Sequence, residues 1–324
     1  MTEDRQRLAL RRPALEARAR IRSALRRWFD DQGFLEVETP ARVRSPGQEV
    51  HLDAIPSGDR WLITSPEYAM KRLVGAGYER IVSMGKCWRS EERGPHHEPE
   101  FTMIEWYRAH TPLAGIADDC EALARLAAEA AGAGQGTAVF GNTPFARVTV
   151  RDLWRDFAGV PLDGDEPAAA LASKAKAAGV ALGTATAWDD IFFQVWLDKI
   201  EPRLPALGPL FVFDWPAPLG ALARPHPGDP RLVERFELYA AGLELANAFG
   251  ELTDAAEQRA RFRAETEARR LRGKAVYPVD EALLAALPAM PATSGVALGF
   301  DRLVMLVLGV REIRDVLAFA SDEI

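Results

Sequence analysis

The sequence has 324 residues, of which 48% are hydrophobic and 27% are charged, and it carries a formal net charge of −7. This composition is typical of a soluble globular protein and excludes a disordered or fibrous chain. The negative charge argues against a basic nucleic-acid-binding domain, and no apolar run reaches the ~18 residues that a membrane-spanning helix needs.

The N-terminal region predicts a helical segment over about 1–32. Apolar residues recur at helical spacing from Ala14 to Gln32, and Gly33 follows where a helix-ending glycine is expected. Nine arginines lie between positions 5 and 27. Either they form a solvated helix face, or they form a docking strip for an acidic partner.

The compartment is predicted from the cysteines and the first residues. Cys87 and Cys120 do not belong to a CxxC pair, and two cysteines make no disulfide framework. The arginines that break up the first residues leave no apolar segment of a secretory signal. We therefore expect a cytoplasmic protein whose thiols are buried and reduced.

The later elements are predicted in chain order from strand-forming clusters and from helical periodicity. The predicted strands are "FLEVETP" ending at Pro40, 61–64, 80–89, 100–109, 209–216 and parts of 231–252. The predicted helices are 66–74, 114–131 and 254–273, and 294–309 passes from a strand into a helix.

The overall pattern predicts one α+β domain over 1–324 with an insertion at about 114–209. Inside that insertion, 168–183 indicates helices and loops. Strands and helices follow one another without a regular βαβ order, which favours an antiparallel β-sheet flanked by helices.

The densest cluster of charged residues is "CWRSEERGPHHEPEFTMIEWY", between two predicted strands. Arg89 ends the first strand, where an arginine suits bidentate binding of a phosphate or carboxylate. Phe101 either stacks on a purine or packs in the core. His96 and His97 are adjacent and so point to opposite faces of a strand, which disfavours a zinc site.

A second cluster places Glu237, Glu244 and Glu251 at equal steps of seven residues. Such spacing fits one helical face, but Gly242 and Gly250 argue against one continuous helix. The carboxylates suit Mg²⁺ together with nucleotide phosphates, or a substrate ammonium, or a solvated acidic face.

A third cluster, "SGVALGFDRLVMLVLG", has glycines before an Asp-Arg pair at a strand-to-helix junction. Glycine allows close backbone approach to a ligand, and the amides of a helix N-terminus favour phosphate. Arg302 is therefore a candidate for a second phosphate clamp.

Together and in this order, the clusters resemble the three signature motifs of class II aminoacyl-tRNA synthetases. "GFLEVETP" is similar to the first, dimer-forming motif, the charged cluster to the second, and "SGVALGFDRLVML" with "IRDVLAF" to the third. "TSPEYAMKRL", "HHEPEFTMIEWY" and "GLELANAFGELTD" are similar to the lysine-specific members. The resemblance implies a class II catalytic domain, a homodimer, and use of ATP and Mg²⁺ to form an aminoacyl-adenylate and pyrophosphate.

The resemblance also implies roles for matching residues. Arg89 and Arg302 would be catalytic, because they would bind the ATP phosphates and stabilise the transition state. The implied ATP site consists of Arg89, Glu91, His97, Glu98, Phe101, Glu244, Leu245, Gly299 and Arg302, and the implied Mg²⁺ ligands are Glu237 and Glu244.

The implied lysine site consists of Ser65, Glu67, Glu105, Tyr107, Asn247, Phe249, Glu251 and Ala297. Ser65, Glu67 and Glu105 would receive the α-amino end, and Tyr107 with Glu251 the side-chain ammonium. A buried carboxylate left unpaired is strongly unfavourable, so a substrate that lacks the ammonium would be rejected.

The expected acceptor of the activated amino acid is inferred from the position of the first motif. The first motif begins within about thirty residues, so we expect no anticodon-binding domain before it. This is similar to ligases that attach lysine or (R)-β-lysine to a lysine of translation elongation factor P, so we expect that acceptor and no tRNA. The alternatives are a minimal tRNA-charging enzyme, a ligase for another acceptor, and a non-catalytic regulatory paralogue.

Several positions depart from the family pattern. Ala297 stands where tRNA-charging relatives tend to have glycine, and its methyl group would reshape the lysine site toward the shifted amino group of β-lysine. Ser90 and Glu98 stand where asparagine is usual, and Ala248 where glycine is usual. Glu98 places a negative charge in the expected nucleotide region.

Overall fold

A computed structural model describes residues 3–132 and 139–324. The expected helical segment at about 1–32 and the expected insertion at about 114–209 each include a few residues outside this described part. The chain divides into two compact units, one formed by Met1–Gly141 with Thr253–Ile324 and the other by Asn142–Leu252. The prediction of a single domain over 1–324 stays a prediction, and each unit is described by itself.

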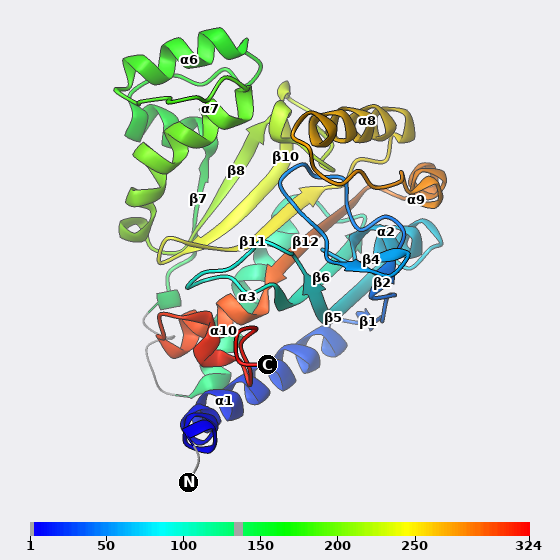
Figure 1. Ribbon diagram of the computed structural model, residues 1–324, viewed down its shortest axis with the longest axis vertical. Coiled ribbons are helices and arrows are strands. Elements are labelled where there is room, and N and C mark those ends of the chain that lie inside the picture. Colours follow the sequence, from blue (N-terminus) through cyan, green and yellow to red (C-terminus); the bar gives the residue numbers. More distant parts are fainter. Residues whose placement is uncertain (1–2, 133–138) are drawn as a thin grey trace. The chain divides into compact units, whose positions relative to one another are not determined.

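The first unit contains helices and strands from both of its segments (Figure 1). From the first segment come α1 (Glu3–Asp31), β1 (Leu35–Glu36), β2 (Arg42–Val43), β3 (Pro56–Ser57), β4 (Arg60–Leu62), α2 (Glu67–Gly75), β5 (Arg80–Trp88), β6 (Glu100–Ala109) and α3 (Leu113–Ala131). From the second come α8 (Ala255–Leu271), α9 (Glu281–Ala286), η5 (Leu287–Ala289), β12 (Thr293–Gly299), α10 (Phe300–Leu308) and η6 (Ile313–Val316).

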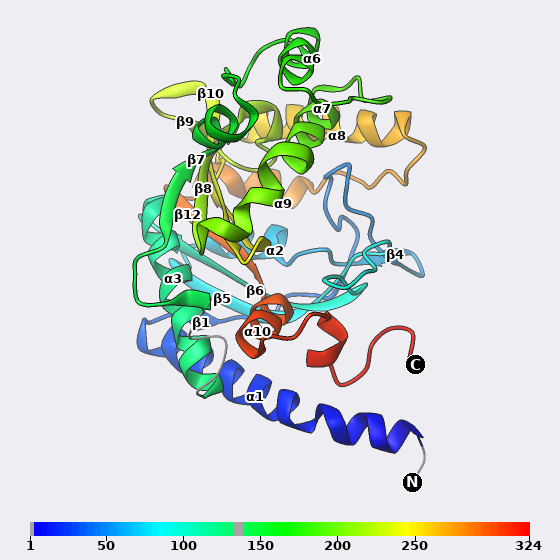
Figure 2. The same cartoon turned by 90° about the vertical axis from the view of Figure 1, so that its left-hand side faces the viewer.

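The sheet of the first unit is mostly antiparallel. Its strand order is β1-β5-β6-β12, with β1 parallel to β5 and the other pairs antiparallel. The strands β2, β4 and β3 form a small separate sheet. Helices α1 and α3 lie on the same side of β5 and β6 (Figure 2). Helices flanking a mostly antiparallel sheet confirm the predicted α+β class.

Alternation along β6 separates a core face from a site face, because successive side chains of a strand point to opposite faces. On the core face, the indole of Trp106 donates to Asp119 of α3 at 3.3 Å, and Arg108 pairs with the same carboxylate at 2.8 Å. Glu105 and Tyr107 therefore lie on the opposite face.

Helix α1 spans Glu3–Asp31, which agrees with the predicted helical segment at about 1–32. Three of its arginines form ion pairs with distant residues of the same chain: Arg11 pairs with Glu323 at 2.6 Å, Arg7 with Glu323 at 3.0 Å, and Arg18 with Asp301 at 2.5 Å. Neither a solvated face nor a docking strip describes these three side chains. Their partners lie at the other end of the sequence, so no local pattern marks them.

Most other predicted elements of the first unit are confirmed, including the helix at 66–74 and the strands at 80–89 and 100–109. The predicted strand "FLEVETP" is wrong in length, because only Leu35–Glu36 pairs with β5. The following residues leave the sheet. Among the described residues of this stretch, the only further backbone hydrogen bond to the sheet is the one that the Val37 N–H donates to the Val82 carbonyl.

The second unit contains a sheet and a helical layer. Its elements are β7 (Ala146–Thr149), α5 (Val150–Leu153), η1 (Trp154–Ala158), α6 (Ala168–Ala177), α7 (Trp188–Val195), η2 (Trp196–Ile200), η3 (Glu201–Leu207), β8 (Leu210–Pro216), η4 (Ala217–Leu219), β9 (Pro225–His226), β10 (Asp229–Ala240) and β11 (Leu243–Gly250). The strand order is β11-β10-β8-β7, and β9 pairs with β10. A core of large aromatic residues, including Trp154, Phe192 and Trp215, packs between the helices and the sheet.

Strands β10 and β11 form a tight hairpin. Ala241 and Gly242 connect them with φ angles of 50° and 80°, which are the left-handed values of a two-residue hairpin turn. A Cβ atom on Gly242 would lie 2.7 Å from the ring of Pro205, so glycine is required there. Glu237 and Glu244 therefore lie on the two strands of a hairpin and Glu251 directly after it, and the three do not share one helix.

Candidate active site

The centre of the site in the first unit is the buried carboxylate of Glu105 on β6. The Ser65 hydroxyl donates to its Oε2 at 2.6 Å, and the Tyr107 hydroxyl donates to its Oε1 at 2.6 Å. Glu105 is 2% exposed, and burial raises its pKa to about 8, with the neighbouring Glu67 adding to the rise. Both hydrogen-bond donors are neutral, and the positive charge of Lys71, which pairs with Glu67, opposes the rise only in part.

Helix α2 fixes the approach to this carboxylate. The Ser65 hydroxyl accepts the backbone N–H of Glu67 at 3.0 Å, which caps the helix start while the same hydroxyl donates to Glu105. One turn later, Lys71 pairs with the Glu67 carboxylate at 2.6 Å. The sequence "TSPEY" therefore places Ser65 and Glu67 beside Glu105, as the resemblance implies.

Glu49 is a further acidic residue of this region that the sequence analysis missed. Its Oε2 is buried and accepts no hydrogen bond within the described part of the chain. Burial raises the pKa of Glu49 to about 7, and the negative charge of Glu67 adds to this rise, whereas Arg89 opposes it. The polar stretch around Glu49 has no regular structure, so its sequence carries no signal for such a position.

The loop that carries Glu49 is fastened from α8. The fully buried guanidinium of Arg269 donates to the carbonyls of Glu49 and Leu52, each at 2.8 Å, and to Asp53 at 2.7 Å. The carboxylate of Glu265 accepts the backbone N–H of Val50 at 2.8 Å. These bonds give an irregular loop a fixed backbone next to the site.

Ala297 lies directly opposite Glu105 in the register of β12 and β6. Side chains at directly opposed positions of antiparallel strands lie on the same face with Cβ atoms about 5 Å apart. Ala297 also packs with Ile63, Cys87 and Met103 on this face. A change of one methyl group at position 297 therefore acts on the immediate surroundings of the Glu105 carboxylate.

Arg89 and Phe101 lie together at the end of the same face. The Arg89 guanidinium lies over the Phe101 ring at 5.1 Å and pairs with Glu92 at 3.1 Å. The Arg89 N–H donates to the Pro99 carbonyl at 2.9 Å, which closes the charged loop at its base. Glu91, the other acidic residue expected here, is exposed.

Arg302 lies against the histidine pair. One of its terminal nitrogens is 2.5 Å from Nε2 of His97, and its Nε donates to the His96 carbonyl at 3.3 Å. Gly299 caps the start of α10, so Arg302 projects from the first turn of that helix. No group of three metal-ligating side chains occurs among residues 3–132 and 139–324.

Two departures from the family pattern have structural partners. The Glu98 carboxylate accepts the backbone N–H of Ser321 at 3.1 Å, so it faces that segment of the chain. The Ser90 N–H donates to the Asp53 carbonyl at 2.8 Å, a bond that any residue except proline would make. A further departure, Ala248, is buried in β11 opposite Phe236.

In the second unit, Glu237 is the counterpart of Glu105. Tyr239 donates to one of its oxygens and Arg235 to the other, each at 2.5 Å. Burial raises the pKa of Glu237 to about 7, and Glu244 adds to the rise while Arg235 opposes it. Arg235 also binds the Asn247 side chain at 3.1 Å.

The other predicted residues of this hairpin share the same face only in part. Glu244 lies opposite Tyr239, and Asn247 opposite Glu237, in the strand register. Phe249 is half-buried and lies 5.8 Å from the guanidinium of Arg235. Leu245 is buried, and Glu251 is buried just beyond the strand.

The carboxylates of Glu237 and Glu244 in this hairpin fit the ligand set of a magnesium ion. Glu237 and Glu244 repel each other, and a divalent cation would relieve that repulsion. Mg²⁺ usually takes only one or two protein carboxylates and completes its shell with phosphates and water. Arg235 already binds one oxygen of Glu237, and sequence reasoning did not include it, although strand alternation places Arg235, Glu237 and Tyr239 on one face.

The structure therefore brings Ser65, Glu67, Glu105, Tyr107 and Ala297 together in the first unit, with Arg89 and Phe101 on the same face. In the second unit it brings together Glu237, Glu244 and Asn247.

Comparisons with known proteins agree with the motifs. The chain matches the family described as "tRNA synthetases class II (D, K and N)" over residues 5–323. It is 39% identical over 316 residues to the "Elongation factor P--(R)-beta-lysine ligase" of Erwinia tasmaniensis (strain DSM 17950 / CFBP 7177 / CIP 109463 / NCPPB 4357 / Et1/99), an alignment that covers 94% of each chain. A protein of the same name from Enterobacter sp. (strain 638) is 39% identical over 324 residues, which are 96% of this chain and 95% of that relative.

Proposed function

Because the chain belongs to the class II tRNA synthetase family (D, K and N), we propose that it activates lysine or (R)-β-lysine with ATP and transfers it to a lysine side chain of elongation factor P. The enzyme is thus a ligase that forms AMP and pyrophosphate. The relatives named as elongation factor P ligases align along almost their whole length, which supports the same acceptor for this chain.

One observation carries the substrate class. Glu105 is a buried carboxylate whose hydrogen-bond donors are the neutral hydroxyls of Ser65 and Tyr107. A buried charge of this kind is favourable only when a cation pairs with it. The α-amino group of lysine, or the shifted amino group of β-lysine, supplies that cation. Glu251, which is 1% exposed, would receive the side-chain ammonium as the resemblance implies, and a neutral amino acid side chain would leave it without a cation.

The residues around Arg89 support the activation step. A carboxylate oxygen of the substrate attacks the α-phosphorus of ATP, the bond to the β-phosphate oxygen breaks, and pyrophosphate leaves. Arg89 and Arg302 would neutralise the charge that develops on the phosphate oxygens, and Phe101 would stack on the adenine. No side chain has to act as a nucleophile, because the protein contributes positioning and charge.

A magnesium ion would supply charge neutralisation of the ATP phosphates when it is bound. As the resemblance implies, Glu237 and Glu244 would hold it, and their mutual repulsion favours a cation. Arg235 orients Glu237 through their hydrogen bond at 2.5 Å.

Transfer completes the reaction. The neutral side-chain amine of a lysine on the acceptor protein attacks the carbonyl carbon of the adenylate, an amide bond forms, the amine loses a proton, and AMP leaves. The proposal includes no tRNA, and it includes the homodimer that the first motif implies. No helix in the described part of the chain is both long and apolar enough to cross a membrane.

A labelling reaction tests the proposal. The protein is incubated with ATP, Mg²⁺ and radioactive lysine or (R)-β-lysine, with elongation factor P and total tRNA offered together, and the products are divided and treated with ribonuclease. We expect label in the elongation factor P band after ribonuclease treatment. Label that disappears with the RNA would make the protein a tRNA-charging enzyme and contradict the proposal.

A further inference from the structure

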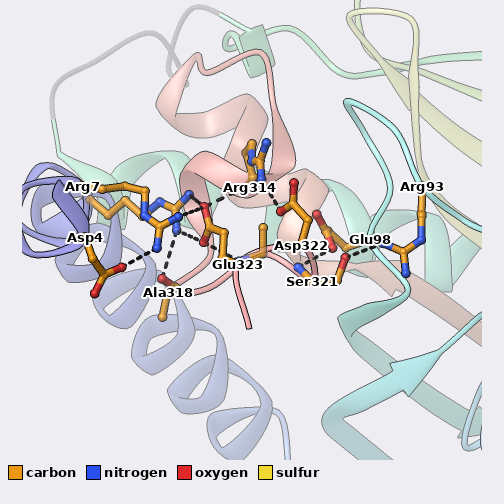
Figure 3. Close-up of polar contacts among 11 residues, drawn as sticks. Asp4, Arg7, Arg93, Glu98, Arg314, Ala318, Ser321, Asp322 and Glu323 are labelled. Atoms are coloured by element: carbon orange, nitrogen blue, oxygen red, sulfur yellow. Dashed lines mark hydrogen bonds and ion pairs between the residues drawn. The ribbon is translucent and has the colours of Figure 1, made fainter.

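The segment 313–323, called the strap below, follows α10 and joins helix α1 to the charged loop 93–98 (Figure 3). At its far end, the Glu323 carboxylate receives two hydrogen bonds from Arg11, at 2.6 and 2.7 Å, and pairs with Arg7 at 3.0 Å. The Ala320 N–H also donates to Glu323 at 2.9 Å. The Glu323 side chain is only 6% exposed, so these bonds are shielded from water.

Two residues before Glu323, at Ser321, the strap binds the charged loop. The Ser321 N–H donates to the Glu98 carboxylate at 3.1 Å, and Arg93 donates to the Ser321 hydroxyl at 3.0 Å (Figure 3). At its start, the Ile313 N–H donates to the Pro95 carbonyl at 2.7 Å. The loop is therefore attached to the strap at three of its residues.

The loop in turn holds residues of the expected nucleotide site. His97 contacts Arg302 at 2.5 Å, and the His96 carbonyl accepts from the same guanidinium. Most of the loop is exposed, and an exposed loop without outside partners is among the first parts of a protein to open. A loop that is ordered before the ligand arrives loses less conformational freedom when the ligand binds.

The Glu323 carboxylate, through which Arg7 and Arg11 anchor the strap, is ionised at physiological pH. The hydrogen bond from Arg11 lowers the pKa of Glu323 to about 2, and Arg314 lies 3.7 Å from the same carboxylate. Bidentate arginine–carboxylate bonds are strong and directional. The departure of Glu98 from the family's usual asparagine fits this arrangement, because a carboxylate is a stronger acceptor for the strap N–H.

We propose that the strap, anchored by Arg7 and Arg11, is a positioning element that holds loop 93–98 in the conformation that binds ATP. Glu323 and Glu98 are then positioning residues, which act on the nucleotide through the loop. The inference rests on the proposed use of ATP, and it goes further by assigning a function to the arginine-rich helix, to the end of the third motif and to the residues that follow it.

The test compares Glu323→Ala with the matched control Glu281→Ala, which breaks another bidentate pair, that of Arg259 with Glu281 on the surface of α8 and α9. ATP affinity is measured by calorimetry, and hydrogen exchange is followed over residues 89–99. We expect Glu323→Ala to raise the Kd for ATP about 5- to 10-fold and to speed exchange in the loop. The control should change neither quantity.

Steady-state pyrophosphate exchange separates positioning from general damage. Glu323→Ala should raise the KM for ATP and leave the KM for lysine within about twofold. Equal rises in both KM values, or an unchanged loop, would overturn the inference. If Glu323→Ala fails to fold, Glu98→Ala should give the same ATP defect, and Glu98→Gln, which keeps an acceptor for the Ser321 N–H, should restore most of the affinity.

The readouts also distinguish this inference from the proposed function. If the unchanged protein binds ATP but does not activate lysine, the proposed function fails while the ATP affinity and the exchange data still test the strap. If the unchanged protein binds no ATP, both fail. If it activates lysine but Glu323→Ala and Glu98→Ala behave like the control, only the strap inference fails.

Discussion

The two units contain the same local motif with different partners, a buried glutamate followed two residues later by a tyrosine. On β6, Glu105 accepts from Tyr107 and Ser65, and on β10, Glu237 accepts from Tyr239 and Arg235. In both strands the tyrosine reaches the glutamate because residues two apart share a face. The difference lies in the second donor, which is neutral for Glu105 and cationic for Glu237.

This difference in the second donor indicates different functions for the two carboxylates. A carboxylate whose hydrogen-bond donors are only hydroxyls has no cationic donor inside the protein, so it is suited to bind a cation that comes and goes with the substrate. A carboxylate that already has an arginine partner is oriented, and it gains less from a further cation. Glu105 is accordingly the stronger candidate for the substrate ammonium, and Glu237 for a ligand of a more highly charged metal ion.

The largest expected effect comes from Glu105→Gln, which keeps the shape and removes the charge. We expect kcat/KM for lysine in pyrophosphate exchange to fall roughly 100- to 1,000-fold, because the substrate ammonium loses a buried partner. Glu281→Gln serves as the control for the loss of one surface charge. A drop of less than about fivefold would show that Glu105 does not bind the ammonium.

A matched pair of tyrosine variants sharpens the comparison. Tyr107→Phe removes one of the two hydroxyls that hold Glu105, and we expect kcat/KM for lysine to fall roughly 10- to 100-fold. Tyr239→Phe leaves the bond from Arg235 to Glu237 intact, so its effect on lysine should be smaller and should consist of a higher Mg²⁺ requirement. Equal effects on lysine in both variants, measured at saturating Mg²⁺, would remove the distinction between the two carboxylates.

A smaller effect is expected at Ala297, the residue opposite Glu105 in the sheet. Ala297→Gly opens space beside the carboxylate, and we expect the ratio of kcat/KM for α-lysine over (R)-β-lysine to rise about 10-fold, the scale of one methyl group in a substrate site. The measurement is pyrophosphate exchange with each isomer. An unchanged ratio would mean that the methyl group does not select between isomers.

The sequence predicts those parts of the fold whose stabilising contacts are local or periodic. The strand 100–109 alternates in part, and the helix 114–131 has a continuous apolar stripe, so both are found near their observed bounds. The first turns of α1 have no such stripe. Arg7 and Arg11 are held by Glu323, which is more than 300 positions away, and no local pattern contains that information.

The residues of the candidate site also include some that local sequence motifs predict and some that they do not. Glu105 and Tyr107 were predicted from a motif on β6, and Ser65 from the motif that begins α2, the helix before β5 and β6. Glu49 was missed because its loop is irregular and is held by Arg269 from α8. Arg235 was missed although strand alternation places it beside Glu237, so a closer application of that rule would have found it.

The smallest expected effect concerns stability as a function of pH. Burial raises the folded-state pKa of Glu105 from 4.5 to about 8 and that of Glu237 from 4.5 to about 7. In this range the folded protein binds more protons than the unfolded chain, so the free energy of unfolding falls as pH rises. The stability contributed by protonated Glu105 is fully present below about pH 4.5 and is lost as pH rises through about 8.

Lysine should reverse this loss, because its ammonium pairs with the ionised carboxylate. We expect the rise in Tm that saturating lysine produces to grow by a few degrees between pH 5 and pH 8. Glu105→Gln, measured without ligand at pH 8, should melt at or above the Tm of the unchanged protein and gain almost nothing from lysine. A variant that melts lower and still responds to lysine would show that the Glu105 carboxylate is paired with a cation inside the protein. Glu105 would then resemble Glu237 in having a cationic partner, and not only in having a tyrosine donor.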